Sequence, residues 1–256
     1  MSHSHDCYKI TTPPDWRILK RLKSRAPTAC LRSTGLGLRF LIQAMITLKS
    51  LSALAFGCVL LGSLFAAEPA KTVSLFDGRT FAGWEGDMAK SFRIQDGAIV
   101  GGNLQTAIPR NEFLGTTRQY TNFVLRAKFK LVGGEKANAG IQFRTQRIPN
   151  HHEVIGYQAD MGQNYWGALY DESRRKKVLA APPAEEIAKI VKFNDWNEYE
   201  IRCEGAHIQL TVNGKKTVDY TEEDSTVPRY GIIAVQIHSG PPTEAWYKDI
   251  TIEELP

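Results

Sequence analysis

Cysteine is nearly absent from most of this 256-residue chain, which contains four in all. Three of them fall within the first 67 residues: Cys7, Cys30 and Cys58. Residues 68–256 therefore contain only Cys203, and a single thiol cannot form an intrachain disulfide. Cys203 alternates with Tyr199 and Ile201, so we expect a buried thiol that packs as a small apolar side chain.

Excess positive charge is also missing from this larger part of the chain. The whole sequence has 32 Lys and Arg against 27 Asp and Glu, a formal net charge of +5. Residues 1–67 contain nine of the basic and two of the acidic residues, so residues 68–256 have 23 against 25 and a net charge of −2. The basic character belongs to the N-terminal segment, and we expect no nucleic-acid partner.

No apolar run is long enough to predict a stable membrane span. The longest, Leu51–Phe65, has about 15 residues, whereas a spanning helix needs roughly 20. It lies within Ile46–Ala67, where Lys49, the apolar run and small residues at the end are typical of a secretory signal. We expect cleavage near Ala67 and export to the periplasm or the extracellular medium.

Two alternatives concern the same segment. Cys58 could be the acylated cysteine of a lipoprotein, although Phe56 is bulky for such a cleavage site. Residues 1–44 are basic and lack apolar periodicity, so they are either an over-long gene model preceding Met45 or an extended basic leader. The predicted organisation is a basic extension at 1–44, a signal peptide at 45–67 and one domain at 68–256.

Helical periodicity is scarce after residue 72, and short alternating strands take its place. Residues 122–131 alternate apolar and basic side chains, as a half-buried antiparallel strand does. Asp96-Gly97 and Asn213-Gly214 predict tight hairpins because both dipeptides tolerate positive φ. The only predicted helix is Ala184–Val191. Many short strands with regular turns predict an all-β antiparallel sandwich or jelly roll.

Several catalytic motifs are missing as well. The sequence has no paired-His zinc motif on a helix, no glycine-rich phosphate loop and no nucleophile elbow, which argues against a serine hydrolase or a nucleotide enzyme. His151-His152-Glu153 could bind a metal, but adjacent histidines in a loop are more often solvated. Glu198 and Glu200 could form a glycosidase pair, yet Arg202 beside them favours an exposed charged stripe.

Polar side chains on three predicted strands suggest a concave site. Alternation places Gln142 with Arg144, Gln158 with Asp160, and Gln236 with His238, each pair on one face of its strand. In such a site Arg144 could bind an oxyanion, His238 could move a proton, and Asp160 could act as base or orient the histidine. The three glutamines could bind sugar hydroxyls, and the nearby aromatic residues could stack on a sugar ring: Tyr165, Trp166 and Tyr170. The alternative is a buried ionic network with a structural role.

These residues occur in an order that resembles the 3-keto-disaccharide hydrolase family, also described as 3-keto-glucoside 1,2-lyase/hydratases. The resemblance covers essentially all of residues 68–256. The motifs that carry it are Ser74–Arg79 with Gly83-Trp84, Asn138–Arg144, Gly156–Asp160, Gly167–Glu172, Asp195–Asn197, Asn213-Gly214 and Val235–His238. It implies a concanavalin-like jelly roll and cleavage of 3-keto-glucosides or 3-keto-disaccharides by elimination across C1–C2 followed by hydration.

The resemblance also suggests roles for the polar residues. Asp160 or His238 would be the C2 base, and Arg144 or a divalent metal ion would stabilise the enolate. Substrate would be bound by Gln142, Gln158, Trp166, Tyr170, Asp171 and Gln236. A non-catalytic carbohydrate-binding module on the same fold is the alternative function, and an adhesive or scaffold domain is a third.

Overall fold

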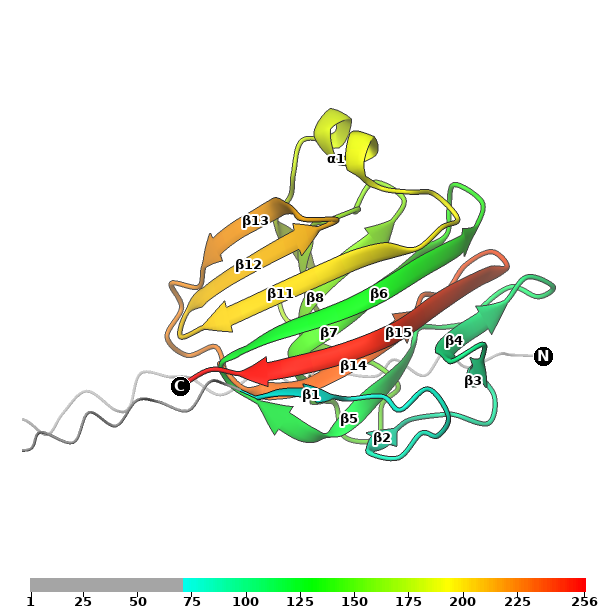
Figure 1. The fold of residues 1–256 in the computed structure, drawn as a ribbon, viewed down its shortest axis with the longest axis horizontal. Helices are drawn as coiled ribbons and strands as arrows, with labels where there is room; N and C mark the ends of the chain where they lie inside the picture. The colour runs from blue at the N-terminus through cyan, green and yellow to red at the C-terminus, as the bar shows by residue number, and fades with distance from the viewer. Residues whose placement is uncertain (1–70) are drawn as a thin grey trace, which may run out of the picture. The chain divides into compact units, whose positions relative to one another are not determined.

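The computed structural model describes residues 71–256, which form two antiparallel β-sheets and one short helix (Figure 1). The predicted basic extension, signal peptide and Cys58 site lie outside the described residues. Within residues 71–256, no helix is long and apolar enough to cross a membrane.

The elements follow one another with short connections. In chain order they are β1 (Thr72–Ser74), β2 (Trp84–Glu85), β3 (Phe92–Gln95), β4 (Ala98–Asn103), β5 (Glu112–Tyr120), β6 (Phe123–Gly133), β7 (Asn138–Arg147), β8 (Val154–Gly162), β9 (Leu169–Glu172), β10 (Lys177–Ala180), α1 (Ala184–Ile190), β11 (Asn197–Glu204), β12 (His207–Val212), β13 (Lys215–Thr221), β14 (Gly231–Ile237) and β15 (Thr243–Glu254).

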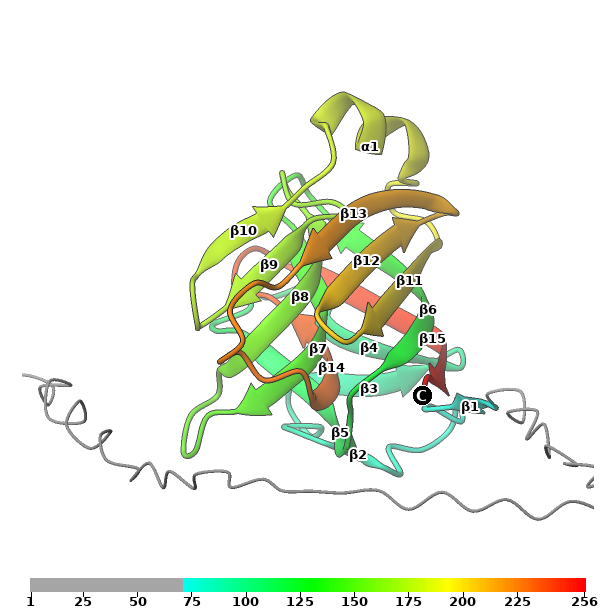
Figure 2. The same ribbon diagram turned by 90° about the vertical axis from the view of Figure 1, so that its left-hand side faces the viewer.

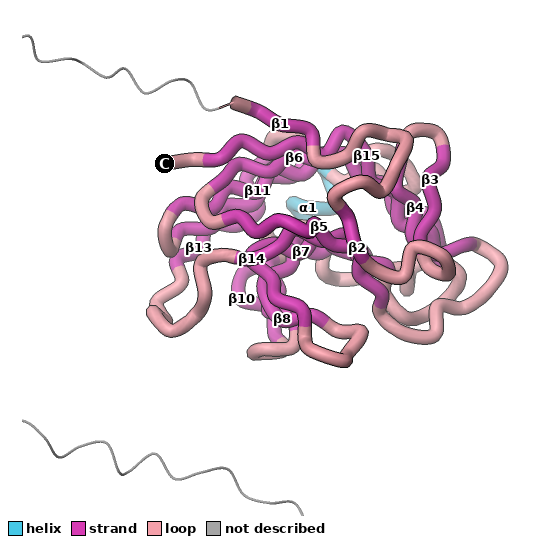
Figure 3. The backbone as a smooth tube through the Cα atoms, turned by 90° about the horizontal axis from the view of Figure 1, so that it is seen from below, coloured by secondary structure: helices cyan, strands magenta, loops and turns pink. Residues whose placement is uncertain are grey.

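The strands form a sandwich of two sheets. The first sheet has the order β13-β12-β11-β6-β15-β4-β3, with β1 also paired to β15. The second has the order β10-β9-β8-β7-β14-β5-β2. Figures 2 and 3 show the two layers from the side and from below. Some neighbours are consecutive in the chain, whereas others are far apart in sequence, such as β6 with β11 and β15, and β14 with β5 and β7. The predicted all-β sandwich is confirmed.

The two predicted hairpins are present. Asp96 and Gly97 have φ values of 51° and 72° between β3 and β4, and Asn213 and Gly214 have 48° and 76° between β12 and β13. Positive φ at both central residues is the geometry of a type I′ turn, which matches the twist of the strands. The helix α1 also forms where it was predicted.

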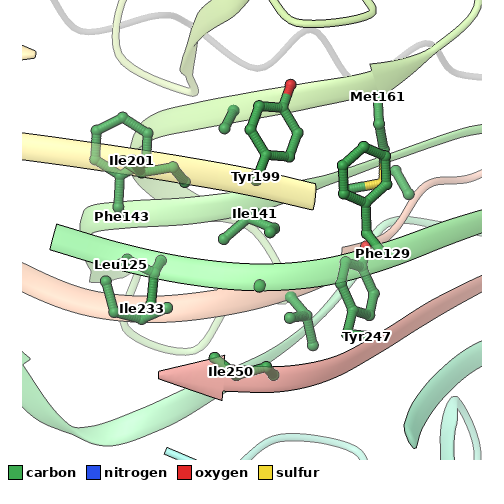
Figure 4. Close-up of a cluster of buried hydrophobic side chains, with 14 of the residues drawn as sticks. Leu125, Phe129, Ile141, Phe143, Met161, Tyr199, Ile201, Ile233, Tyr247 and Ile250 are labelled. Atoms are coloured by element: carbon green, nitrogen blue, oxygen red, sulfur yellow. The ribbon is translucent and has the colours of Figure 1, made fainter. Parts of the chain in front are cut away.

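The core lies between the sheets and is rich in aromatic residues (Figure 4). Phe129 stacks on Tyr199 with ring centroids 4.9 Å apart, and Phe143 stacks on Tyr157 at 5.7 Å. Cys203 is fully buried, as predicted, and burial raises the pKa of its thiol to about 12. The thiol therefore stays protonated and packs as an apolar group.

Candidate functional site

Four polar side chains lie together on the outer face of the second sheet, and we call Gln142, Gln158, Asp160 and Gln236 the polar row. Their neighbours along the strands belong to the hydrophobic core, so alternation turns the polar row to the opposite face. Gln142 is paired with Gln158, and Gly140 is paired with both Asp160 and Gln236. The predicted convergence of three strands is therefore present for these four residues.

Hydrogen bonds join the members of the polar row. Gln142 Nε2 donates to Gln158 Oε1 at 2.6 Å, and Thr145 Oγ1 donates to Gln142 Oε1 at 3.0 Å. The Gln158 side chain lies over Gly140, where a Cβ atom would come within 2.5 Å of it. Glycine at this position is what allows the Gln158 amide to reach Asp160.

Asp160 is a buried carboxyl group surrounded by donors. Its Oδ1 accepts hydrogen bonds from Met161 N at 2.9 Å and from Asn138 Nδ2 at 3.3 Å. Burial raises its pKa to about 8, and hydrogen bonds from Gln158, Asn138 and Met161 N oppose this rise. A carboxyl with this pKa is a stronger base than an ordinary aspartate, and it exchanges a proton close to neutral pH.

Glu172 is a second carboxyl with a raised pKa, and the sequence analysis did not single it out. Burial and the nearby charge of Glu153 raise its pKa to about 7. Glu172 follows Tyr170 by two residues in β9, so both side chains lie on the face of the polar row, where Tyr170 is paired with Gln158. The same alternation could have revealed Glu172 from the sequence.

Gln236 has an unusual environment for a buried amide. Its side chain is 0% exposed, and neither Nε2 nor Oε1 has a hydrogen-bond partner among residues 71–256. An unpaired buried polar group costs about 1–3 kcal/mol, so such groups usually bind water or a ligand. Glu153 Oε2 is likewise buried and unpaired within this part of the chain.

The connection between β7 and β8 brings Glu153 towards the end of β14. Asn111 Nδ2 donates to Glu153 Oε1 at 3.1 Å, and Asn111 Oδ1 accepts from Ser239 N at 2.9 Å. His238 lies next to this link, and its main-chain N–H donates to Asn138 O at 3.3 Å. His238, Glu153, Tyr170 and Glu172 are all half-buried, and Tyr170 and Glu172 lie on the face of the polar row.

Two buried tyrosines of the first sheet, which Figure 4 shows in the core, contact the backbone of the polar row. Tyr199 Oη donates to Asp160 O at 2.5 Å. Tyr247 Oη lies 2.6 Å from Gln236 O and 3.2 Å from Gly140 O. These carbonyl groups belong to Asp160, Gln236 and Gly140, and Gly140 is the β7 residue that is paired with the other two. The hydroxyls therefore hold the backbone of three site strands from the core side.

The structure places Arg144 away from the polar row, so the prediction that it shares a face with Gln142 is wrong. A bulge between Phe143 and Gln146 interrupts the alternation, and Arg144 has φ 47°. Its guanidinium donates to Thr121 O at 2.9 and 2.7 Å and to Gly205 O at 2.7 Å. Arg144 thus binds two turns and is not positioned to stabilise an enolate.

Asp171 also lies on the wrong side of the sheet for the predicted substrate contact. It alternates with Tyr170 and Glu172, and its side chain is 0% exposed. Its carboxylate forms ion pairs with Arg174 at 2.8 Å and Arg175 at 3.2 Å. These contacts assign Asp171 to a buried ionic network.

Trp166 and Tyr170 do not form one sugar platform. The Trp166 ring lies near Phe129 and Phe193, with centroids 6.4 and 5.5 Å away. Tyr170 instead has Tyr165 as its aromatic neighbour, at 6.5 Å and nearly perpendicular. The aromatic pair at the polar row is therefore Tyr165 with Tyr170.

The possible metal ligands pair with each other. His152 Nε2 lies 3.4 Å from Glu153 Oε1, and His151 Nδ1 accepts a hydrogen bond from Glu153 N at 3.0 Å. Across residues 71–256, no three His, Cys, Asp or Glu side chains are grouped closely enough to hold a metal ion. Glu200 pairs with Arg126 at 2.8 Å on the other sheet, in agreement with an exposed charged stripe.

Comparisons with known proteins agree with this architecture. The 3-keto-alpha-glucoside-1,2-lyase-like domain family matches residues 71–253, while no match is found among curated proteins. A candidate glycosyl hydrolase of Parabacteroides distasonis ATCC 8503 has a TM-score of 0.54 at 20% identity, covering 72% of this chain and 100% of that one. The carbohydrate-binding module CBM66 of Bacillus subtilis has a TM-score of 0.52 at 13% identity, covering 67% and 96%.

A Bacillus subtilis protein with a galectin-like fold is similar to the same degree. Its TM-score is 0.52 at 13% identity, over 73% of this chain and 96% of that one. At such identities the likeness concerns the fold, and it confirms the concanavalin-like jelly-roll prediction.

Proposed function

This chain belongs to the 3-keto-alpha-glucoside-1,2-lyase-like family, and from that premise we propose that it cleaves 3-keto-glucosides or 3-keto-disaccharides by elimination across C1–C2 followed by hydration. Family membership supports the coarser statement that the function concerns carbohydrates. The specific reaction is our proposal, and the chemistry of the polar row supports it.

The reaction needs a base and a stabiliser of negative charge. The ketone at C3 acidifies the C2–H bond, so a base can take that proton and leave an enolate with its charge on the ketone oxygen. The enolate then re-forms the ketone while the C1–O bond breaks, and the leaving oxygen takes up a proton. In a second step water adds to the C1=C2 bond, with hydroxyl at C1 and hydrogen at C2.

The unpaired Gln236 amide is the observation on which the proposal depends. A buried amide with no partner among residues 71–256 has a donor and an acceptor available to a bound molecule. Nε2 would donate to the developing oxyanion, and Oε1 would accept from a sugar hydroxyl. Such a preorganised donor in a site with little water is worth far more than one in solution.

Asp160 is the proposed C2 base, and His238 is its alternative. Three donors face Asp160, an arrangement suited to a carboxylate, and its pKa of about 8 provides the basicity. Glu172, with a pKa of about 7, would donate a proton to the leaving oxygen as the C1–O bond breaks. Gln142 and Gln158 would orient the sugar, and Tyr165 and Tyr170 would pack against its ring.

The test is turnover of a defined substrate by the purified protein. We expect release of methanol from methyl 3-keto-glucoside, none from the unoxidised methyl glucoside, and a loss of release in Asp160→Asn. Saturable binding of the keto-sugar without release would instead indicate a carbohydrate-binding module. Absence of both binding and release would contradict either function.

Export is a separate proposal, and it concerns the signal predicted from the sequence. If the segment before Ala67 is a cleaved leader, the N-terminus of the secreted product will lie near Glu68. N-terminal sequencing of that product tests it, and the same measurement detects a lipoprotein that begins at Cys58.

A further inference from the structure

A groove of about 800 Å³ lies at one end of the sandwich, apart from the polar row, and we call it the rim groove. Three connections meet there: the β6–β7 turn, the β8–β9 loop and the segment between α1 and β11 (Figure 1). Its volume is within the range of small-molecule sites, about 300–1,000 Å³. The lining side chains that matter most are Glu135, Lys136, Asn164, Trp166, Phe193 and Asn194.

The apolar part of the rim groove is a fixed pair of aromatic rings. Phe193 is 63% exposed, the largest exposure among the large hydrophobic residues of the described part of the chain. The Trp166 ring meets it at 5.5 Å and 83°, an edge-to-face arrangement, and is itself backed by Phe129 in the core. Trp166 therefore holds Phe193 in place and leaves much of its ring accessible. An apolar ring face of this kind matches the C–H face of a pyranose.

The polar part of the rim groove has amide groups at fixed positions. Gln163 and Asn194 both adopt positive φ, 48° and 57°, which is costly for residues other than glycine. Gln163 Nε2 donates to Lys136 O at 3.0 Å, and Asn194 Oδ1 accepts from Gly133 N at 3.4 Å. These bonds hold the two side chains, while Asn194 Nδ2 and Gln163 Oε1 have no bond of their own within residues 71–256. Donors and acceptors beside an aromatic ring are what sugar hydroxyls require.

The β8–β9 loop connects the rim groove with Asp160. Two main-chain hydrogen bonds fasten the loop to Asp160: Gly167 N donates to Asp160 O at 3.2 Å, and Asp160 N donates to Ala168 O at 3.0 Å. Consecutive residues of this loop serve the two sites, because Tyr165 pairs with Tyr170 at the polar row and Trp166 lines the groove. A molecule of two linked rings could therefore contact both sides of the loop.

We propose that the rim groove binds the leaving sugar of a 3-keto-disaccharide, with Phe193 as its stacking platform. The inference rests on the proposed function and makes it more specific: the enzyme prefers a second pyranose at C1 over a small aglycone. The preference arises because only a second ring can use the Phe193 contact.

Phe193→Ala tests this preference, with Tyr230→Ala as the matched control. Tyr230 is also exposed, at 49%, and precedes β14, away from the rim groove. We expect Phe193→Ala to lower kcat/KM for a 3-keto-disaccharide about tenfold through KM, roughly the loss of one stacking contact. Turnover of methyl 3-keto-glucoside should stay within about twofold in both variants. Equal losses for the two substrates, or no loss for either, would overturn the proposal.

Direct binding separates this proposal from the proposed function. If the wild-type protein cleaves neither keto-sugar, calorimetric titration with the unoxidised disaccharide still tests the groove. Weaker binding by Phe193→Ala than by Tyr230→Ala, with glucose binding alike in all three proteins, would support a sugar site there. Equal binding by the two variants, or no saturable binding by the wild type, would refute it. Thermal unfolding of both variants checks that each is folded.

Discussion

The outer faces of both sheets carry polar side chains at every second residue. These side chains are exposed and paired on the first sheet, and they are buried on the second. On the first sheet, Arg126 pairs with Glu200 and Glu253 at 2.8 and 3.3 Å, and Lys128 pairs with Asp249 at 2.9 Å. These side chains are 27–56% exposed. Such exposed pairs contribute little to stability because water solvates the charges whether or not they pair.

On the second sheet, the polar side chains are buried and incompletely paired. Gln142 and Gln236 are 0% exposed, and Asp160 is 3% exposed with a raised pKa. A protein that only needed a solvated surface would not retain a buried amide such as that of Gln236 without a partner among residues 71–256. The comparison shows that alternation alone identifies an outer face, whereas burial and pairing distinguish a candidate site from a solvated surface.

The largest expected effect is that of Asp160→Asn, which removes the proposed base. We expect turnover of a 3-keto-glucoside to fall about 10³-fold, within the range for loss of a general base. A smaller loss than that of His238→Ala would transfer the role of base to His238. The matched measurement is kcat/KM for both variants on the same substrate.

The same substitution should stabilise the fold at alkaline pH. The folded state binds a proton at Asp160 up to about pH 8, whereas the unfolded carboxyl releases it near its usual value of 3.8. The contribution of Asp160 to stability therefore decreases as pH rises from about 4 to about 8, and an asparagine is free of this penalty. Thermal unfolding should show a larger gain for Asp160→Asn at pH 9 than at pH 5; an equal gain would contradict a raised pKa.

Gln236→Met should have the next largest effect, with opposite signs for activity and stability. Loss of one oxyanion donor is expected to lower kcat about 10²-fold. Stability should stay the same or rise by about 1–3 kcal/mol, because the amide has no partner in the described chain. Chemical unfolding measures the latter, and a clear destabilisation would show that the amide has a structural role.

Tyr247→Phe should give a moderate effect through the backbone of the site. The hydroxyl contacts the carbonyls of Gln236 and Gly140, so we expect a loss of about 1 kcal/mol and a several-fold decrease in kcat. Tyr157→Phe is the control, since its buried hydroxyl donates to Glu222 at 2.6 Å and not to a site strand. Both variants should be destabilised, but only Tyr247→Phe should lose activity; equal kcat values would refute the supporting role.

The smallest effect is expected on the first sheet. Glu200→Gln breaks the exposed pair with Arg126 and should change stability by less than about 1 kcal/mol. Turnover should remain that of the wild type. A loss of activity comparable to that of Gln236→Met would contradict the contrast between the two faces.

Part of the candidate site could be predicted from alternation. Gln142, Gln158 and Gln236 lie in stretches of strand that alternate without a bulge, and the structure brings them together as expected. Arg144 could not be predicted in this way, because the bulge in β7 reverses its direction. Asp171 was expected to bind substrate, although its position between Tyr170 and Glu172 places it on the opposite face. The same alternation places Glu172 on the face of the polar row.

By itself the sequence determined the strands, the two type I′ hairpins and the all-β class, since these depend on local φ preferences and on a side-chain period of two. Only the tertiary structure decided which polar residues meet, which are buried and which lack partners. The physical reason is that burial and pKa shifts depend on elements distant in the sequence. The Asp160 carboxyl is an ordinary aspartate until the fold buries it beside Asn138 of β7 and Gln158 of β8.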